Sequence, residues 1–167
     1  MYIVGDFVLH STSGVCKIED IREENFTEQK RNYYVLHPII DGNKSTIYVP
    51  VDTQKCPFRK LLKKVEIHQV IAESLKENIE WIDSNNIRKV TYSDILHSDN
   101  TSKIIAMIVC LHERKKAVND NGKKFSIMDE QLLNDAEKRI HQEFSYVLSI
   151  KEQEVPEYII GRLCKTQ

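Results

Sequence analysis

The feature that most constrains the fold is a change in the period of the apolar residues near residue 57. Before it, β-branched and aromatic residues come in short runs separated by turn residues, which is typical of β-strands. After it, apolar residues recur every three or four positions, which is typical of amphipathic helices. The sequence therefore predicts an α+β chain, with a β domain at residues 1–60 and an all-helical domain at residues 61–167.

Four runs in the first part predict strands, at residues 7–9, 15–18, 33–36 and 46–49. Turn residues separate the first two runs at 11–14 and the last two at 41–43, where Asp-Gly favours a hairpin because glycine tolerates a positive φ. The polar stretch 22–32 predicts a long hairpin tip. Four or five short strands in so few residues favour a small, strongly bent β-barrel of the SH3 or Tudor kind.

Helices are predicted at residues 64–76, 86–96, 101–118, from 126 onward, and at 156–164. Apolar residues cover most of the circumference of 101–118, so we expect this helix to be the buried centre of a helical bundle. Ser126 is a predicted N-cap with Asp129 in the third position of the helix, and Ser149 with Glu152 gives a second capping-box signal. The second part is therefore predicted to be a bundle of four or five helices.

Composition excludes several classes of protein. Lys plus Arg is 24 and Asp plus Glu is 25, a net charge of −1, so the chain is not a globally basic DNA binder, although local basic patches are allowed. No apolar run approaches the ~18–20 residues of a membrane-spanning helix. The first residues lack the pattern of a signal peptide. These features predict a cytoplasmic protein, and the widely spaced cysteines are then expected to be free thiols.

Motifs for catalysis are not found in the sequence. It contains no glycine-rich phosphate loop and no nucleophile elbow, and its cysteines form no metal-binding or redox pair. His112-Glu113 begins like a zinc-protease motif, but Lys116 stands where the second histidine would be. The sequence predicts a protein that is not an enzyme and that holds neither a metal nor a cofactor.

Two further features leave alternatives open. Basic residues flank the predicted turn at 121–122 and could bind phosphates, but charges that offset a helix dipole at a solvated helix end explain them too, and charge alone favours this explanation. Trp81, the only tryptophan, stands between two predicted helices. It is either a packing anchor, which the sequence alone favours, or an exposed wedge that inserts at a DNA step.

Motifs in both parts resemble, in their order and spacing, the CarD/CdnL/TRCF family of bacterial transcription factors, closest to the CarD-like proteins of Gram-positive anaerobes. The matching strings are VGDFVL at 4–9, SGVCKIEDI at 13–21, YYVLHP at 33–38, TIYVPVD at 46–52, LHERKK at 111–116, GKKFS at 122–126 and DEQLL at 129–133. Shorter matches lie at 136–137, 143–144 and 147–148. The resemblance extends from residue 1 to about residue 160.

This resemblance implies a Tudor-like first domain that binds the β subunit of RNA polymerase by adding an edge strand to a polymerase sheet. The residues that would do so are Thr46, Ile47, Tyr48, Val49 and Pro50. The helical domain would contact promoter DNA at the upstream edge of the melted bubble and tune the stability of the open complex. The residues implied there are Trp81, Arg88, Lys89, Arg114, Lys115, Lys116, Lys123 and Lys124.

The chain departs from better-known members of the family at two places. Basic residues follow the tryptophan in those members, whereas Ile82 and Asp83 follow Trp81 here, and Tyr48 and Glu24 stand near positions where other members carry basic residues that meet the polymerase. The expected partners are the polymerase β subunit and promoter DNA, bound weakly and without sequence preference by an isolated monomer. The alternative is a protein-interaction adaptor whose Tudor-like module binds a different partner.

Overall fold

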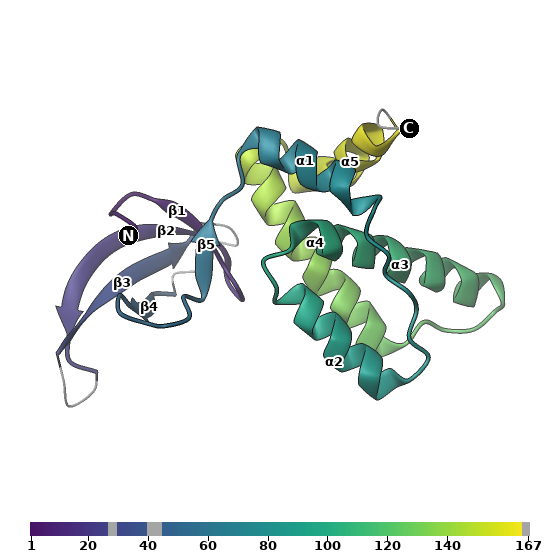
Figure 1. Ribbon diagram of the computed structural model, residues 1–167, viewed down its shortest axis with the longest axis horizontal. Helices are drawn as coiled ribbons and strands as arrows, with labels where there is room; N and C mark the ends of the chain where they lie inside the picture. The colour runs from purple at the N-terminus through teal and green to yellow at the C-terminus, as the bar shows by residue number, and fades with distance from the viewer. Residues whose placement is uncertain (27–29, 40–44, 165–167) are drawn as a thin grey trace. The chain divides into compact units, whose positions relative to one another are not determined.

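The computed structural model describes residues 1–26, 30–39 and 45–164. The chain forms two compact units, Met1–Leu62 and Lys63–Gln167 (Figure 1). The first is a β-sheet and the second is helical, which confirms the predicted α+β order. Over the described ranges, no helix combines the length and the apolar character that crossing a membrane requires.

The first unit is an antiparallel sheet of five strands in the order β4-β3-β2-β1-β5. The strands are β1 Phe7–His10, β2 Gly14–Glu24, β3 Arg31–Pro38, β4 Ile47–Pro50 and β5 Phe58–Lys60. Gly14 has a φ of +70° where the chain turns from β1 into β2, a conformation that glycine adopts without steric cost. Strands β2 and β3 extend into the polar stretch 22–32, so the hairpin tip is shorter than predicted. The predicted turn at 41–43 lies outside the described residues.

The sheet is open, and the closed barrel expected from the sequence is not confirmed. Strands β4 and β5 stand at opposite ends of the strand order, and no pairing joins them within the described part of the chain. Barrel closure requires hydrogen bonds between the two outer strands, and these strands are only four and three residues long. The chain therefore keeps two sheet edges, at β4 and at β5.

One face of the sheet carries the core of this unit, because alternate residues of a strand point to the same face. The core residues are Val8, Cys16, Ile18, Tyr34, Leu36, Val49 and Phe58. A register shift between Ile18 and Asp20 interrupts the pairing of β2 with β3. Tyr48 comes one residue before the core residue Val49 in β4, and it therefore lies on the opposite face.

In the described residues of the second unit, 63–164, there are five α-helices and one short 3₁₀ helix. They are α1 Lys64–Ser74, α2 Asn85–Leu96, α3 Thr101–Asp120, α4 Ile127–Leu148, η1 Glu152–Glu154 and α5 Val155–Leu163. Helix α3 packs against α1, α2 and α4, and α1 also contacts α5 (Figure 1). Helix α3, predicted to be the buried centre of the bundle, buries Ile104, Met107 and Leu111 against these neighbours but leaves Val109 43% exposed.

The two predicted capping signals have different outcomes. Ser126 is the N-cap of α4, and its hydroxyl accepts from the Asp129 N–H, as predicted. Ser149 is not an N-cap: it ends α4 with a φ of 56°, in the left-handed conformation common at helix C-termini. At the start of η1, the Lys151 N–H donates instead to the Glu154 carboxylate at 2.7 Å. The serine–glutamate spacing alone did not distinguish a helix end from a helix start.

Candidate interaction surfaces

Strand β4 is a sheet edge whose outward hydrogen-bonding groups can be assigned. Its neighbour β3 pairs Val49 with Tyr34, and the Val51 N–H donates to the Asn32 carbonyl at 2.9 Å. In an antiparallel pair, hydrogen-bonded and non-hydrogen-bonded positions alternate. The N–H and carbonyl of Tyr48 therefore point away from β3. The Pro50 carbonyl is turned the same way, but it accepts from the Thr53 N–H at 3.3 Å, and proline has no N–H to offer.

The Tyr48 side chain belongs to a cluster with Arg22, Phe26 and Tyr33, here called the Tyr48 cluster. Arg22 donates from Nη2 to the Tyr48 hydroxyl at 2.9 Å and from Nε to Glu24 at 2.6 Å. The Phe26 ring packs edge-on against the rings of Tyr48 and Tyr33, with centroids 4.8 and 5.2 Å apart. Phe26 is 56% exposed. Arg22 and Phe26 were not expected from the sequence, because no spacing rule links them to residue 48.

The five residues predicted to bind polymerase thus divide into two groups. Ile47 and Val49 direct their side chains to the core and support the strand. Tyr48 turns its N–H and carbonyl outward, whereas the Pro50 carbonyl already accepts from Thr53, and Thr46 is exposed just before the strand begins. The structure makes the backbone of β4, rather than an apolar patch, the accessible feature of this segment.

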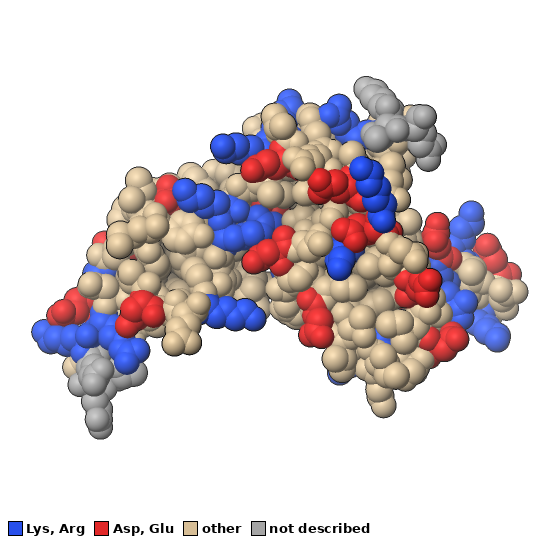
Figure 2. All heavy atoms as spheres, in the orientation of Figure 1, with Lys and Arg blue, Asp and Glu red and all other residues tan. Residues whose placement is uncertain are grey.

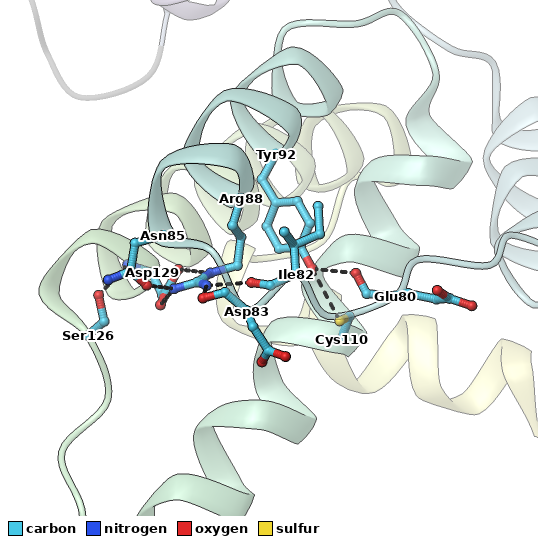
Figure 3. Close-up of polar contacts among 9 residues, drawn as sticks. All are labelled: Glu80, Ile82, Asp83, Asn85, Arg88, Tyr92, Cys110, Ser126 and Asp129. Carbon is cyan, nitrogen blue, oxygen red and sulfur yellow. Dashed lines mark hydrogen bonds and ion pairs between the residues drawn. The ribbon is translucent and has the colours of Figure 1, made fainter.

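Arg88, predicted to contact DNA, is instead an interior residue that is 2% exposed. Its guanidinium forms a bidentate ion pair with Asp129, with both N···O distances 2.8 Å (Figure 3). Nη1 also donates to the carbonyls of Ile82 and Asp83, and Nη2 donates to Asn85. An arginine has five N–H donors, and these contacts use all of them. The structure therefore contradicts a phosphate-binding role for Arg88.

Trp81 lies in the irregular segment between α1 and α2 and is partly buried. The guanidinium carbon of Arg88 is 4.0 Å from the centre of its rings, and that of Arg114 on α3 is 4.9 Å away. Both distances are within the range of a cation–π contact. Arg88 is buried, but Arg114 is exposed. The fold therefore brings an exposed cation onto Trp81 from 33 residues further along the chain.

The other predicted DNA contacts differ in their availability. Lys115 is ion-paired with Glu130 at 2.7 Å, which directs its side chain toward α4. The remaining lysines are exposed: Lys89, Lys116, Lys123 and Lys124. A shallow pocket of ≈ 280 Å³ near the turn that joins α3 to α4 is lined by Arg114, Ala117, Val118, Asn121 and Lys123. On the face shown in Figure 2, basic side chains are interspersed with acidic ones rather than gathered into one large patch.

Two observations concern side chains of the types that catalyse reactions or bind metal ions. The Tyr92 hydroxyl donates to the Glu80 carbonyl at 3.0 Å and lies 3.6 Å from the Cys110 sulfur, and burial raises the pKa of Tyr92 (Figure 3). Burial thus keeps the Tyr92 hydroxyl protonated, and its contact with the Cys110 thiol is one of packing. In the parts of the chain that the structure describes, no group of three or more histidine, cysteine or carboxylate side chains could hold a metal ion.

Comparison with known proteins identifies the first unit. A family model described as the CarD-like/TRCF RID domain matches residues 2–62, which is almost the whole of the unit Met1–Leu62. A search of curated proteins finds no match to this chain. The family match therefore covers the sheet and both of its edges, and it ends where the helical unit begins.

Proposed function

We propose that this chain, a member of the CarD-like/TRCF RID family through its residues 2–62, binds the β subunit of RNA polymerase with the outer edge of β4. Membership makes it a transcription-associated protein of the type that interacts with RNA polymerase. The observation that carries the proposal is the outward orientation of the Tyr48 N–H and carbonyl at a sheet edge inside the matched domain. An edge of this kind accepts a further strand by β-augmentation.

The Tyr48 cluster adds side chains to this backbone contact. Arg22 is partly exposed and donates to the Tyr48 hydroxyl, and Glu24 at 2.6 Å and Asp20 at 3.8 Å offset its charge. Phe26 supplies exposed aromatic area next to it. A partner strand that pairs with β4 would meet the ion-paired Arg22 and the ring of Phe26 on the same face of the sheet as Tyr48.

The helical unit is proposed to contact promoter DNA at the upstream edge of the melted bubble and to tune the stability of the open complex. Trp81 with Arg114, and the exposed lysines near the α3–α4 turn, are the groups that support this role. Because the net charge is −1, the DNA contact is weak by itself. Binding to polymerase compensates by raising the local concentration of the helical unit at the DNA. The mechanism is binding alone and requires no catalytic residue.

The test compares variants of Tyr48 in binding to a purified fragment of the polymerase β subunit. Tyr48→Ala removes the side chain but keeps the outward N–H, whereas Tyr48→Pro removes both. Because a hydrogen bond contributes about 0.5–1.5 kcal/mol, the proline variant should bind about 2- to 12-fold more weakly than the alanine variant. Lys60→Pro is the matched control, because it removes an outward N–H from β5 at the opposite edge.

The outcomes separate the proposal from its alternative. Equal affinity of Tyr48→Ala and Tyr48→Pro would rule out backbone pairing at β4. Weakening by Lys60→Pro alone would assign the contact to β5. Failure of the unmodified chain to bind the β fragment at micromolar concentration would favour an adaptor that uses its RID domain for another partner.

A further inference from the structure

Trp81 stands in a segment without regular secondary structure, yet the residues on both sides of it are anchored. Residues 77–84 form neither helix nor strand between α1 and α2. The Glu80 carbonyl, immediately before Trp81, accepts from the Tyr92 hydroxyl at 3.0 Å. The Ile82 carbonyl, immediately after it, accepts from Arg88 Nη1. Two side chains of α2 therefore hold the backbone at Glu80 and Ile82, the neighbours of Trp81, and Figure 3 shows both contacts.

Arg88 can act as an anchor because it is itself fixed. Asp129, in the first turn of α4, holds its Nε and Nη2 at 2.8 Å each, and Asn85 accepts from Nη2 at 2.8 Å. The Asp129 side chain is 2% exposed, so the pair is shielded from water. The guanidinium plane thus links α4 to the segment after Trp81 and also lies 4.0 Å from the indole.

These contacts determine which groups a ligand can reach. Arg88 is buried and all its donors are used, whereas Arg114 approaches the same indole from α3 and remains exposed. Ile82 and Asp83 contribute carbonyls to Arg88, so the residues after Trp81 serve to hold the segment in place. The positive charge beside Trp81 comes from Arg114.

We propose that Arg88 is a positioning residue: tied to Asp129, it fixes the segment 80–83 so that Trp81 and Arg114 form one rigid aromatic and cationic surface for DNA. The inference rests on the proposed DNA contact of the helical unit. It assigns to this unit a binding surface built from α3 and the α1–α2 segment, and a buried ion pair that sets the geometry of that surface.

The test uses Trp81 as its own reporter, because it is the only tryptophan of the chain. In Arg88→Lys the positive charge opposite Asp129 is kept, but a lysine lacks the planar fork that reaches the carboxylate and two carbonyls together. Acrylamide quenching and the fluorescence anisotropy decay of Trp81 are measured in the free protein. We expect the quenching constant to rise about twofold and a nanosecond local motion to appear.

A second buried arginine of the same unit provides the matched control. Arg139 donates to the carbonyls of Leu96, the last residue of α2, and of Ser98, which lies between α2 and α3. Arg139→Lys therefore removes a buried guanidinium of similar surroundings without touching residues 80–83, and it should leave Trp81 quenching unchanged. Asp129→Asn, which retains one acceptor for Arg88, should give an intermediate value and provides a second measurement if the lysine variant does not fold.

A DNA readout distinguishes this inference from the function on which it rests. The lifetime of competitor-challenged promoter complexes formed with RNA polymerase is compared for Arg88→Lys, Trp81→Ala and the double variant. We expect Arg88→Lys to reproduce much of the Trp81→Ala effect, and the double variant to add little. Unchanged Trp81 quenching in Arg88→Lys overturns the positioning role, whatever the DNA result. Increased quenching with an unchanged lifetime in all variants upholds the positioning role and refutes DNA binding by Trp81.

Discussion

Replacing Arg88 by alanine should be among the most damaging single changes in the helical unit. The substitution leaves the Asp129 carboxylate 2% exposed and without its cation, and it removes the donor to two backbone carbonyls. Breaking a buried pair by deleting one partner costs about 3–5 kcal/mol. The unit Lys63–Gln167 has 167 − 63 + 1 = 105 residues. At an unfolding entropy of about 2.1 cal/mol/K per residue, the melting temperature should fall by roughly 14–23 °C.

The measurement is thermal and urea unfolding followed by Trp81 fluorescence, which reports only on the helical unit, together with circular dichroism. A double-mutant cycle with Asp129→Ala separates the pair from its surroundings: the double variant should be less unstable than the sum of the single variants by about 2 kcal/mol or more. Lys89→Ala, at the neighbouring exposed position, should change the stability by less than about 0.5 kcal/mol. Additive losses, or a cost of Arg88→Ala below about 1 kcal/mol, would refute the reasoning.

Three further outcomes follow from other parts of the chain. His10 accepts backbone N–H bonds at Nδ1, and burial lowers its pKa. The contribution of His10 to the stability of the fold should therefore be complete above about pH 6.5 and be lost as the pH falls through the lowered pKa. A titration of the imidazole above pH 6.5, followed by NMR, would contradict this. Burial raises the pKa of Cys16 to about 11, so about one Cys16 thiol in a thousand is ionised at pH 8. Cys16 should therefore react with a thiol reagent far more slowly than exposed Cys56. Equal reaction rates in the native protein would show that Cys16 is not buried. Lys123→Gln with Lys124→Gln should reduce the salt slope of binding to bubble-containing DNA by about 0.9 for each phosphate that the lysines neutralise, and an unchanged slope would exclude these lysines from the interface.

Local pattern predicted the elements well, because each depends on neighbouring residues. Strands β1 to β4 follow from runs of β-branched and aromatic residues, whereas β5, Phe58–Lys60, has no such run and was not predicted. Ser126 was identified as an N-cap from the serine itself and the carboxylate three positions later. The open sheet was not predicted, because barrel closure depends on whether the two outer strands, β4 and β5, pair with each other, and the residues of these short strands do not determine that pairing. The family resemblance located the RID domain, and the match to residues 2–62 confirms it.

The candidate site shows where sequence reasoning has a physical limit. Arg88 and Lys89 are adjacent and equally basic, but successive residues of a helix point about 100° apart, so one is buried and the other is exposed. The buried partner of Arg88 is Asp129, 41 positions away, and the residues around Arg88 and around Asp129 do not predict this ion pair. Asp129 was expected only as the third residue of the helix that Ser126 begins. The negative charge of Asp129 is favourable at the N-terminus of α4, but its carboxylate is buried and paired with Arg88.

The edge at β4 also bears on how the protein avoids aggregating with itself. An exposed sheet edge is a template on which further copies can add strands without limit. Here the strand is four residues long and ends in Pro50, whose ring blocks any donor at that position. Two copies could exchange few hydrogen bonds through such an edge. A different protein that brings a longer strand, with side chains matched to Arg22 and Phe26, can bind in a way that a second copy cannot. The proline thus favours a heterologous complex over a fibre.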